Sequence, residues 1–478
     1  MVNMKKYKAK NKGQVIVFMA LVMVGLIAIV GLMTDGGMLL IEYGKLKRAV
    51  DAAAISASQQ FRRGFTGADL ATAAQNFLRL NSSEASNINV YRCKRDPNTN
   101  ALDTTADGTI NADDLCTLPR RKLVRVEATR TVQFGFMRVL GIESSNITTS
   151  AVGEAASIDL VLIIDTSGSM SYETYTSGDD NRLDHSSEDP AVCNGNVTTP
   201  CEPLNTVKNV ADDFMDNMFF PYDRVAVIAM TNQQPNALTR DPADSVLHLS
   251  DNEASVRAAI AGLRVFEPPV CDFNTRTPAS GPCISHASSV PALECFKYRD
   301  FGDVSSCNNS NVGGTFYRAA AEYSLGLIRE DSLWVTIALL SGPANATDAQ
   351  TGYPDGLCPS YTWNSSVHPY CRDAYVSTYH PKTDPLYDAD DYARDAAYYL
   401  ADPVNGQGVT VFTIGLGNQI RNFSKGDANA GEALLQYAAL TAGGSSANHG
   451  DYFYSPDTSG LATIFSRIAD NIFTRISR

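Results

Sequence analysis

The chain has 478 residues, with 44% hydrophobic and 19% charged residues and a formal net charge of −13 at pH 7. This length exceeds one ordinary hydrophobic core, so we expect two or three folded units, and the composition excludes a largely disordered chain. The acidic balance argues against a nucleic-acid-binding protein, because no basic patch offsets it beyond the first dozen residues.

The N-terminus carries five lysines and then an uncharged apolar run, residues 15–33. That run is long enough to span a bilayer, and lysines before it predict a cytoplasmic N-terminus. We therefore expect a basic cytoplasmic start (1–13), a transmembrane helix (14–34) and a single-pass cell-membrane protein whose remainder lies outside the cytoplasm or at the cell surface. A cleaved signal peptide is the competing interpretation. The length of the run and the lack of a small-x-small cleavage site after it argue against that alternative.

The helical pattern continues beyond the apolar run and predicts a stalk helix over 35–63. Apolar residues recur at helical spacing at Leu39, Tyr43, Leu46, Val50, Ala54 and Ala57. The strings "KGQVIVFMALVMVGLIAIVGLMTDGG" and "LKRAVDAAAISAS" resemble the N-terminus of TadG-like proteins of the Tad (Flp-type) pilus assembly system. The matching positions are Gly13, Gln14, Asp35, Gly36, Asp51 and Ala52 to Ala54. The resemblance implies a role in pilus assembly.

Residues 64–156 predict a small α+β domain, with one helix followed by alternating strands. Within it, "DTTADGTINADDL" at 103–115 resembles an EF-hand loop and is similar to the loops of dockerin modules. The resemblance implies a Ca²⁺ site, although Thr105 is a poor ligand and the last carboxylate is shorter than glutamate. A polar surface loop is the alternative. The candidate ligands are Asp103, Thr105, Asp107, the carbonyl of Thr109, Asn111 and Asp114.

The ten cysteines lie in polar stretches rich in Pro, Gly and Asn, and none forms a CxxC pair. An even count in such stretches favours disulfides in an oxidising compartment, and pairing between sequence neighbours is the simplest arrangement. Cys93 and Cys116 bracket the candidate calcium loop, and a disulfide between them would close it. The sequence leaves the other pairings open.

From residue 157 to 478, buried-strand runs alternate with helical patterns. The runs "IDLVLIID", "RVAVIAM", "SLWVTIALLS" and "GVTVFTIGLG" are continuously apolar, as expected for strands buried on both faces, and "DYFYS" predicts an edge strand. Such alternation predicts an α/β fold, with a mostly parallel sheet and helices on both faces. Ligands in such sheets bind beyond the carboxyl ends of the strands.

The first strand ends in "DTSGSM", which places Asp165, Ser167 and Ser169 at that edge. One carboxylate and neutral hydroxyls form an all-oxygen set that suits Mg²⁺, Mn²⁺ or Ca²⁺. The string resembles the metal-ion-dependent adhesion site of von Willebrand factor A domains, D-x-S-x-S. The family's second element, a threonine after Gly-Gly, matches Thr315 in "NVGGTFYRAA". The resemblance implies a Rossmann-like head and a metal held by these four residues.

The third sequence element of the family's metal site is different in this chain. The family has an aspartate in a Thr-Asp-Gly or Ser-Asp-Gly string after its fourth strand, where this sequence reads "ALLSGPANATD". Ser341 or a one-residue gap stands at that position, and Asp348 is a possible substitute at a different spacing. We expect this departure to alter the affinity for the metal and the choice of metal.

Three stretches look inserted into the head, at about 171–202, 265–310 and 343–386, and they hold eight of the ten cysteines. Long loops on the ligand face commonly carry function, so we expect a disulfide-pinned rim around the metal. Decorative insertions braced by disulfides are the alternative.

The sequence contains no HExxH, GxSxG or P-loop string, so we expect a binding protein and no enzyme. The resulting hypothesis is a membrane-anchored protein of pilus assembly or surface adhesion. Its metal would bind an acidic residue of a protein partner, such as a pilus or secretion component. One alternative is a structural scaffold or tip protein with a vestigial metal site. The other is a hydrolase whose site uses the inserted loops.

Overall fold

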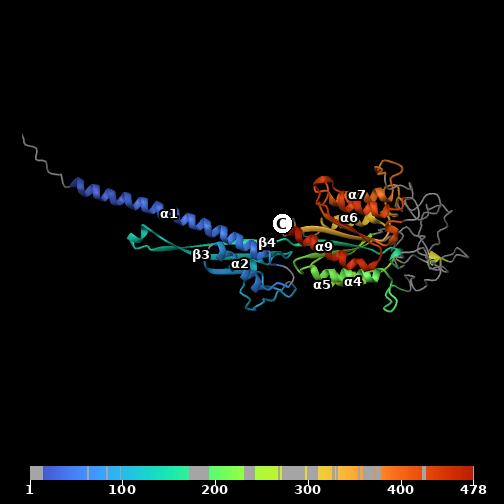
Figure 1. Cartoon of the computed structure of the whole chain (residues 1–478), viewed down its shortest axis with the longest axis horizontal. Helices are drawn as coiled ribbons and strands as arrows, with labels where there is room; N and C mark the ends of the chain where they lie inside the picture. The colour runs from blue at the N-terminus through green and yellow to red at the C-terminus, as the bar shows by residue number, and fades with distance from the viewer. Residues whose placement is uncertain are drawn as a thin grey trace, which may run out of the picture. The chain divides into compact units, whose positions relative to one another are not determined.

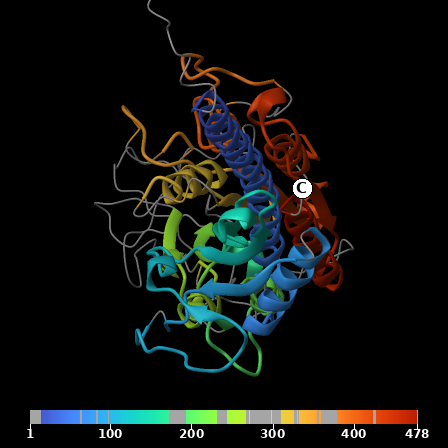
Figure 2. The same ribbon diagram turned by 90° about the vertical axis from the view of Figure 1, so that its left-hand side faces the viewer.

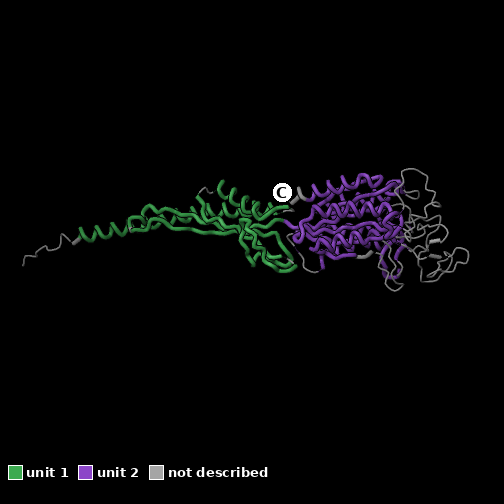
Figure 3. Tube along the Cα trace, turned by 90° about the horizontal axis from the view of Figure 1, so that it is seen from below, with its two compact units in different colours: residues 1–155 green, residues 156–478 purple. Residues whose placement is uncertain are grey.

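The computed structural model divides the chain into two compact units, residues 1–155 and 156–478 (Figure 3). The residues that the structure describes are 14–61, 64–81, 84–96, 98–171, 193–230, 243–266, 270–271, 297–298, 310–325, 329, 332–353, 356–358, 372, 378–422 and 427–476.

The first unit begins with one continuous helix, α1 (Gln14–Ser58). Its 45 residues give a length of about 68 Å. The large apolar side chains from Val15 to Met33 are 48–73% exposed. Among the described residues, α1 is the one helix long and apolar enough to cross a membrane. The second helix, α2 (Gly67–Asn81), packs against α1.

A four-stranded sheet with the order β2-β1-β3-β4 completes this unit. Its strands are β1 (Ser86–Arg92), β2 (Ile110–Asn111), β3 (Lys122–Gln133) and β4 (Ser144–Ala155), with the short helices η1 (Asp113–Leu115) and η2 (Met137–Leu140) between them. The long hairpin β3–β4 lies alongside α1 (Figures 1 and 2). The contact is close, because a Cβ on Gly153 would lie 2.2 Å from the carbonyl oxygen of Ala54.

The second unit is built on a six-stranded sheet with the order β12-β11-β10-β5-β6-β7. All neighbouring strands are parallel except β6 and β7, which are antiparallel. The strands are β5 (Ile158–Asp165), β6 (Arg224–Met230), β7 (Ala243–Ser250), β10 (Leu333–Leu340), β11 (Thr410–Leu416) and β12 (Tyr452–Ser455), and β8 (Val270–Cys271) pairs separately with β9 (Lys297–Tyr298).

Helices cover both faces of this sheet (Figure 1). Apolar residues of α4 (Leu204–Phe214), α5 (Glu253–Gly262) and α9 (Leu461–Ile476) form a core on one face. Those of α6 (Val312–Glu322), α7 (Ala389–Ala401) and α8 (Ala430–Leu440) form a core on the other. The short helices are η3 (Gly168–Ser171), η4 (Met215–Asn217), η6 (Asn418–Ile420), η7 (Gly444–Ser446) and η8 (Thr458–Gly460).

The expected α/β architecture is confirmed, including the edge position of β12. Strand β7 was not predicted from the sequence. It forms the opposite edge and has no long apolar run, because an edge strand in antiparallel contact does not need to be buried on both faces. The predicted rim of inserted loops lies largely outside the described residues.

Two disulfides join sequence neighbours, as expected. They are Cys93–Cys116 and Cys193–Cys201. Cys358 is also disulfide-bonded, and no described cysteine is free. The disulfide of the first unit closes the segment that contains the candidate calcium loop.

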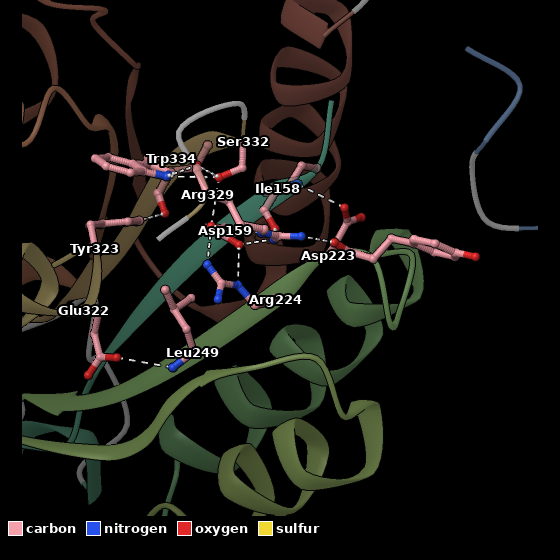
Figure 4. Close-up of polar contacts among 12 residues, drawn as sticks. Ile158, Asp159, Asp223, Arg224, Leu249, Glu322, Tyr323, Arg329, Ser332 and Trp334 are labelled. Atoms are coloured by element: carbon pink, nitrogen blue, oxygen red, sulfur yellow. Dashed lines mark hydrogen bonds and ion pairs between the residues drawn. The ribbon is translucent and has the colours of Figure 1, made fainter. Parts of the chain in front are cut away.

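A buried ion-pair cluster lies at the start of β5 (Figure 4). Asp159, which is 1% exposed, accepts from Arg224 Nε at 2.9 Å and Arg224 Nη2 at 2.7 Å, and it also pairs with Arg329. Ser332 Oγ donates to the same carboxylate at 2.8 Å. Because β5 runs from Ile158 to Asp165, this cluster and the candidate metal residues lie at opposite ends of the strand.

Candidate metal-binding site

Asp165 ends β5 and is completely buried. The backbone N–H of Ser167 donates to its Oδ1 at 2.8 Å, so the loop folds back over the carboxylate as soon as the strand ends. Ser167 Oγ lies 2.9 Å from Ser169 Oγ. The D-x-S-x-S string therefore places one carboxylate and two hydroxyls together within a single turn.

Ser341 completes this group from the neighbouring strand. Strands β5 and β10 pair in parallel with Ile164 opposite Leu339, so the residues after both strands emerge at the same edge. Ser341 donates to Asp165 Oδ2 through its backbone N–H at 2.7 Å and its hydroxyl at 2.6 Å. Its hydroxyl is also 2.5 Å from Ser169 Oγ. The serine at the position of the expected aspartate is thus part of the cluster, a role that its sequence position alone does not predict.

The charge of Asp165 has no cationic partner among the described residues. Its contacts there are the N–H and O–H groups of Ser167 and Ser341. Burial raises the pKa of Asp165, and the hydrogen bonds from Ser341 and Ser167 offset only part of that rise. A buried carboxylate without a counter-ion is costly, so a cation beside it would stabilise the ionised form.

Thr315, the fourth expected ligand, lies in the first turn of α6 and is also fully buried. Its hydroxyl donates to the carbonyl oxygen of Val312 at 2.7 Å. The two glycines before it permit close packing. A Cβ on Gly313 would lie 2.4 Å from Tyr392 Cδ1, and one on Gly314 would lie 2.3 Å from Asn311 Nδ2. The Gly-Gly-Thr string therefore seats the start of α6 against its neighbours.

Asp348 does not substitute for the missing aspartate in the described contacts. Its carboxylate pairs with Arg318 at 2.6 Å and accepts from Asn311 Nδ2 at 2.8 Å and Tyr392 Oη at 3.0 Å. Asn311 in turn caps α6, because its Oδ1 accepts from the N–H of Gly314 at 2.9 Å. Asp348 thus braces the helix that carries Thr315.

The donor set fits a hard divalent cation. Asp165, Ser167, Ser169 and Ser341 offer carboxylate and hydroxyl oxygens in mutual contact, and Mg²⁺, Mn²⁺ and Ca²⁺ prefer such ligands. The hydroxyls can rotate to turn lone pairs toward an ion, since their present partners are one another and Asp165. With only one carboxylate, the ion would keep positive charge for a further acidic ligand.

The candidate calcium loop, by contrast, does not fit calcium. Lys94 Nζ donates to the Thr105 carbonyl oxygen at 2.5 Å and to Asp107 Oδ1 at 3.1 Å, so a protein cation contacts two expected ligands at once. Arg92 Nη2 pairs with Asp107 Oδ2 at 2.7 Å. Although burial acts to raise the pKa of Asp107, hydrogen bonds from Thr109, Arg92 and Lys94 lower it overall.

The other expected calcium ligands are engaged in similar ways. Asn111 Oδ1 accepts from the N–H of Lys94 at 3.0 Å, and Asp114 pairs with Arg125 at 2.6 Å. Asp103 Oδ1 accepts from the N–H of Thr105 at 2.9 Å. Arg92 in β1, Lys94 just after it and Arg125 in β3, which the loop motif does not include, thus neutralise these acids in the described contacts.

A second acidic cluster lies at the start of α7. One oxygen each from Asp388, Asp390 and Asp391, all buried, lie within 4.8 Å of one another. Asp388 caps the helix in a capping box with Asp391, and Asp391 accepts from the N–H of His380 at 2.8 Å. Asp390 faces Arg394 at 3.8 Å. The sequence string "DADD" does not by itself indicate a metal site, because acidic residues at a helix start ordinarily serve as caps.

Residues 13–60 match the family model described as "Putative Flp pilus-assembly TadE/G-like". This confirms the resemblance seen in the N-terminal sequence. The N-terminal segment is TadE/G-like. No curated protein matches the chain in sequence.

Several solved structures are similar at low identity. The proximal thread matrix protein 1 from the mussel byssus matches at 12% identity and a TM-score of 0.33, over 67% of this chain and 49% of that one. The PilB minor pilin from Streptococcus sanguinis matches at 12% identity and a TM-score of 0.35, over 80% of this chain and 84% of that one. The vWF domain of the type V pili tip protein Mfa5 from Porphyromonas gingivalis matches at 14% identity and a TM-score of 0.33, over 68% of this chain and 97% of that one. The chain spans about half the length of the first of these proteins. Similarities of this size are too low to transfer a function.

Proposed function

We propose that this chain is a membrane-anchored protein of a Tad-type pilus system whose head binds a protein partner through a divalent metal ion. The TadE/G-like match over 13–60 and the exposed apolar surface of α1 support the anchor and the pilus association. The lysines before α1 support a cytoplasmic N-terminus and an extracytoplasmic head. The proposed role is binding, without catalysis.

The observation that carries the metal site is the isolated charge of Asp165. It is fully buried, contacts only N–H and O–H donors among the described residues, and lies beside three serine hydroxyls. An ion held by Asp165, Ser167, Ser169 and Thr315, the four ligands that the sequence predicts, would neutralise this charge. It would also supply an electrophilic centre for an acidic side chain of the partner.

Calorimetric titration of the full chain in detergent with Mg²⁺, Mn²⁺ and Ca²⁺ tests the metal site. The wild type should bind one of the ions, and Asp165→Ala should not. Asp213→Ala, which removes an exposed carboxylate from α4, is the matched control and should bind like the wild type. Equal binding by wild type and Asp165→Ala would refute the site.

Co-purification of the chain with pilus components from cells tests the partner. A metal-dependent contact should be lost on chelation and in Asp165→Ala, while Asp213→Ala retains it. Retention in all three conditions would support a structural role through the N-terminal helix. If the titration fails, the hydrogen bonds from Ser341 would favour this second role, because they stabilise part of the charge of Asp165 without an ion.

A further inference from the structure

The β3–β4 hairpin ends in an apolar tip, residues 134–143, which includes η2. Three of its large apolar side chains are exposed: Phe136 by 48%, Val139 by 86% and Ile142 by 46%. The tip also exposes the cationic Arg138 and, where β4 approaches, the anionic Glu143. An aromatic ring, aliphatic side chains and an arginine together are the composition found where proteins contact the headgroup region of a bilayer.

Asp35 of α1 fixes this tip to the helix. Its Oδ1 accepts from the N–H of Gly135 at 2.9 Å, and its Oδ2 accepts from the N–H of Phe136 at 3.0 Å and of Met137 at 2.7 Å. The carboxylate is only 3% exposed. One turn earlier on α1, Gly31 permits the approach, since a Cβ there would lie 2.7 Å from Phe136 Cβ. The tip is therefore held at the level of residues 31–35.

The surface of α1 remains apolar on both sides of this level. Met33 is 73% exposed, and beyond Asp35 the exposed side chains include Leu40 at 70% and Ile41 at 60%. The next charged residue is Glu42. Residues 15–33 of α1, about 28 Å long, match the hydrocarbon core of a bilayer, and residues 34–41 extend the helix by about 12 Å beyond it. Residues 34–41 thus correspond to the headgroup region.

We propose that the hairpin tip is a second membrane-contact element, which inserts Phe136, Val139 and Ile142 into the outer headgroup region of the bilayer that α1 spans. This inference rests on the membrane anchor proposed above. The contact requires polar groups at that depth to be satisfied, and Asp35 and the three N–H groups of the tip satisfy one another. A lipid surface is the favoured occupant because the tip is continuous with the apolar surface of α1.

Lipid quenching in vesicles tests the proposal with the full chain. Val139→Trp places a fluorophore on the tip at a position exposed enough to accept it, and Leu102→Trp, at a 45% exposed position in the same unit, is the control. Both variants are reconstituted in phosphatidylcholine–phosphatidylglycerol vesicles whose acyl chains carry bromine near the headgroup. The wild type, with its two native tryptophans, gives the background emission.

We expect bromolipid to remove most of the emission that Val139→Trp adds and little of that added by Leu102→Trp. Protection of the tip tryptophan from both bromolipid and aqueous iodide would mean that a second copy covers it, and quenching by iodide alone would mean that water does. Either result overturns the lipid contact. Flotation of the wild-type vesicles separates the two proposals. Protein that floats without tip quenching leaves the anchor intact, whereas protein that does not float overturns the anchor and this inference with it.

Discussion

Substitution of Asp159 by asparagine should strongly destabilise the head. The change keeps the shape of the side chain but removes the charge that neutralises Arg224 and Arg329 in a buried cluster. Removal of one partner from a buried ion pair costs about 3–5 kcal/mol, because the remaining charge stays desolvated. We expect the free energy of unfolding at pH 7 to fall by an amount in that range.

Urea unfolding in detergent, followed by tryptophan fluorescence, measures this loss. Trp334 reports on the cluster directly, since its Nε1 donates to Arg329 O at 3.2 Å and to Ser332 Oγ at 3.0 Å. The control is Asp216→Asn, which removes a surface carboxylate 65% exposed and 2.6 Å from Arg257. An exposed pair of this kind is worth at most about 1 kcal/mol.

The stability difference between the wild type and Asp159→Asn should also depend on pH. Burial alone would raise the pKa of Asp159, but hydrogen bonds and charges from Arg224 and Arg329 lower it below the ordinary 3.8. Because the pKa of Asp159 is lower in the folded state, its ionised carboxylate contributes fully to stability above the unfolded-state pKa. This contribution is lost as the pH falls through the folded-state pKa. The stability difference between wild type and Asp159→Asn should therefore shrink in acid. A difference under about 1 kcal/mol at pH 7, or one that stays constant into strong acid, would refute the reasoning.

Three further variants probe the two units. Ser341→Asp places a second carboxylate beside Asp165, so the melting temperature without metal should fall by several degrees. The rise in melting temperature on adding Mg²⁺ should exceed that of the wild type, and an unchanged rise would contradict the site. Gly153→Ala should destabilise the first unit by about 1–3 kcal/mol in chemical denaturation, because the added Cβ meets the backbone of α1. The control Gly44→Ala should be neutral or stabilising, because no atom lies within 4 Å of the added Cβ. Asp103→Ala should leave calorimetric calcium binding of the full chain unchanged, since Asp103, Asp107 and Asp114 are already paired with basic residues. A lost calcium site would support the EF-hand interpretation instead.

The sequence alone located much of the architecture, because burial leaves a direct pattern in the residues. Strands buried on both faces must be apolar throughout, which identified β5, β6, β10 and β11. The uncharged run in α1 identified the candidate span. The D-x-S-x-S string marked the loop after β5, since its spacing is local and does not depend on distant contacts.

Tertiary structure decided which groups meet. Ser341 lies 176 residues from Asp165 and reaches it because β5 and β10 pair in parallel register. Lys94 reaches Asp107 and the Thr105 carbonyl oxygen from outside the motif and places a protein cation in the loop. Asp35 matched a family pattern in the sequence, but its contact with the hairpin tip, about a hundred residues away, became visible only in the folded unit. Contacts across such separations depend on register and packing, and no local pattern of residues encodes them.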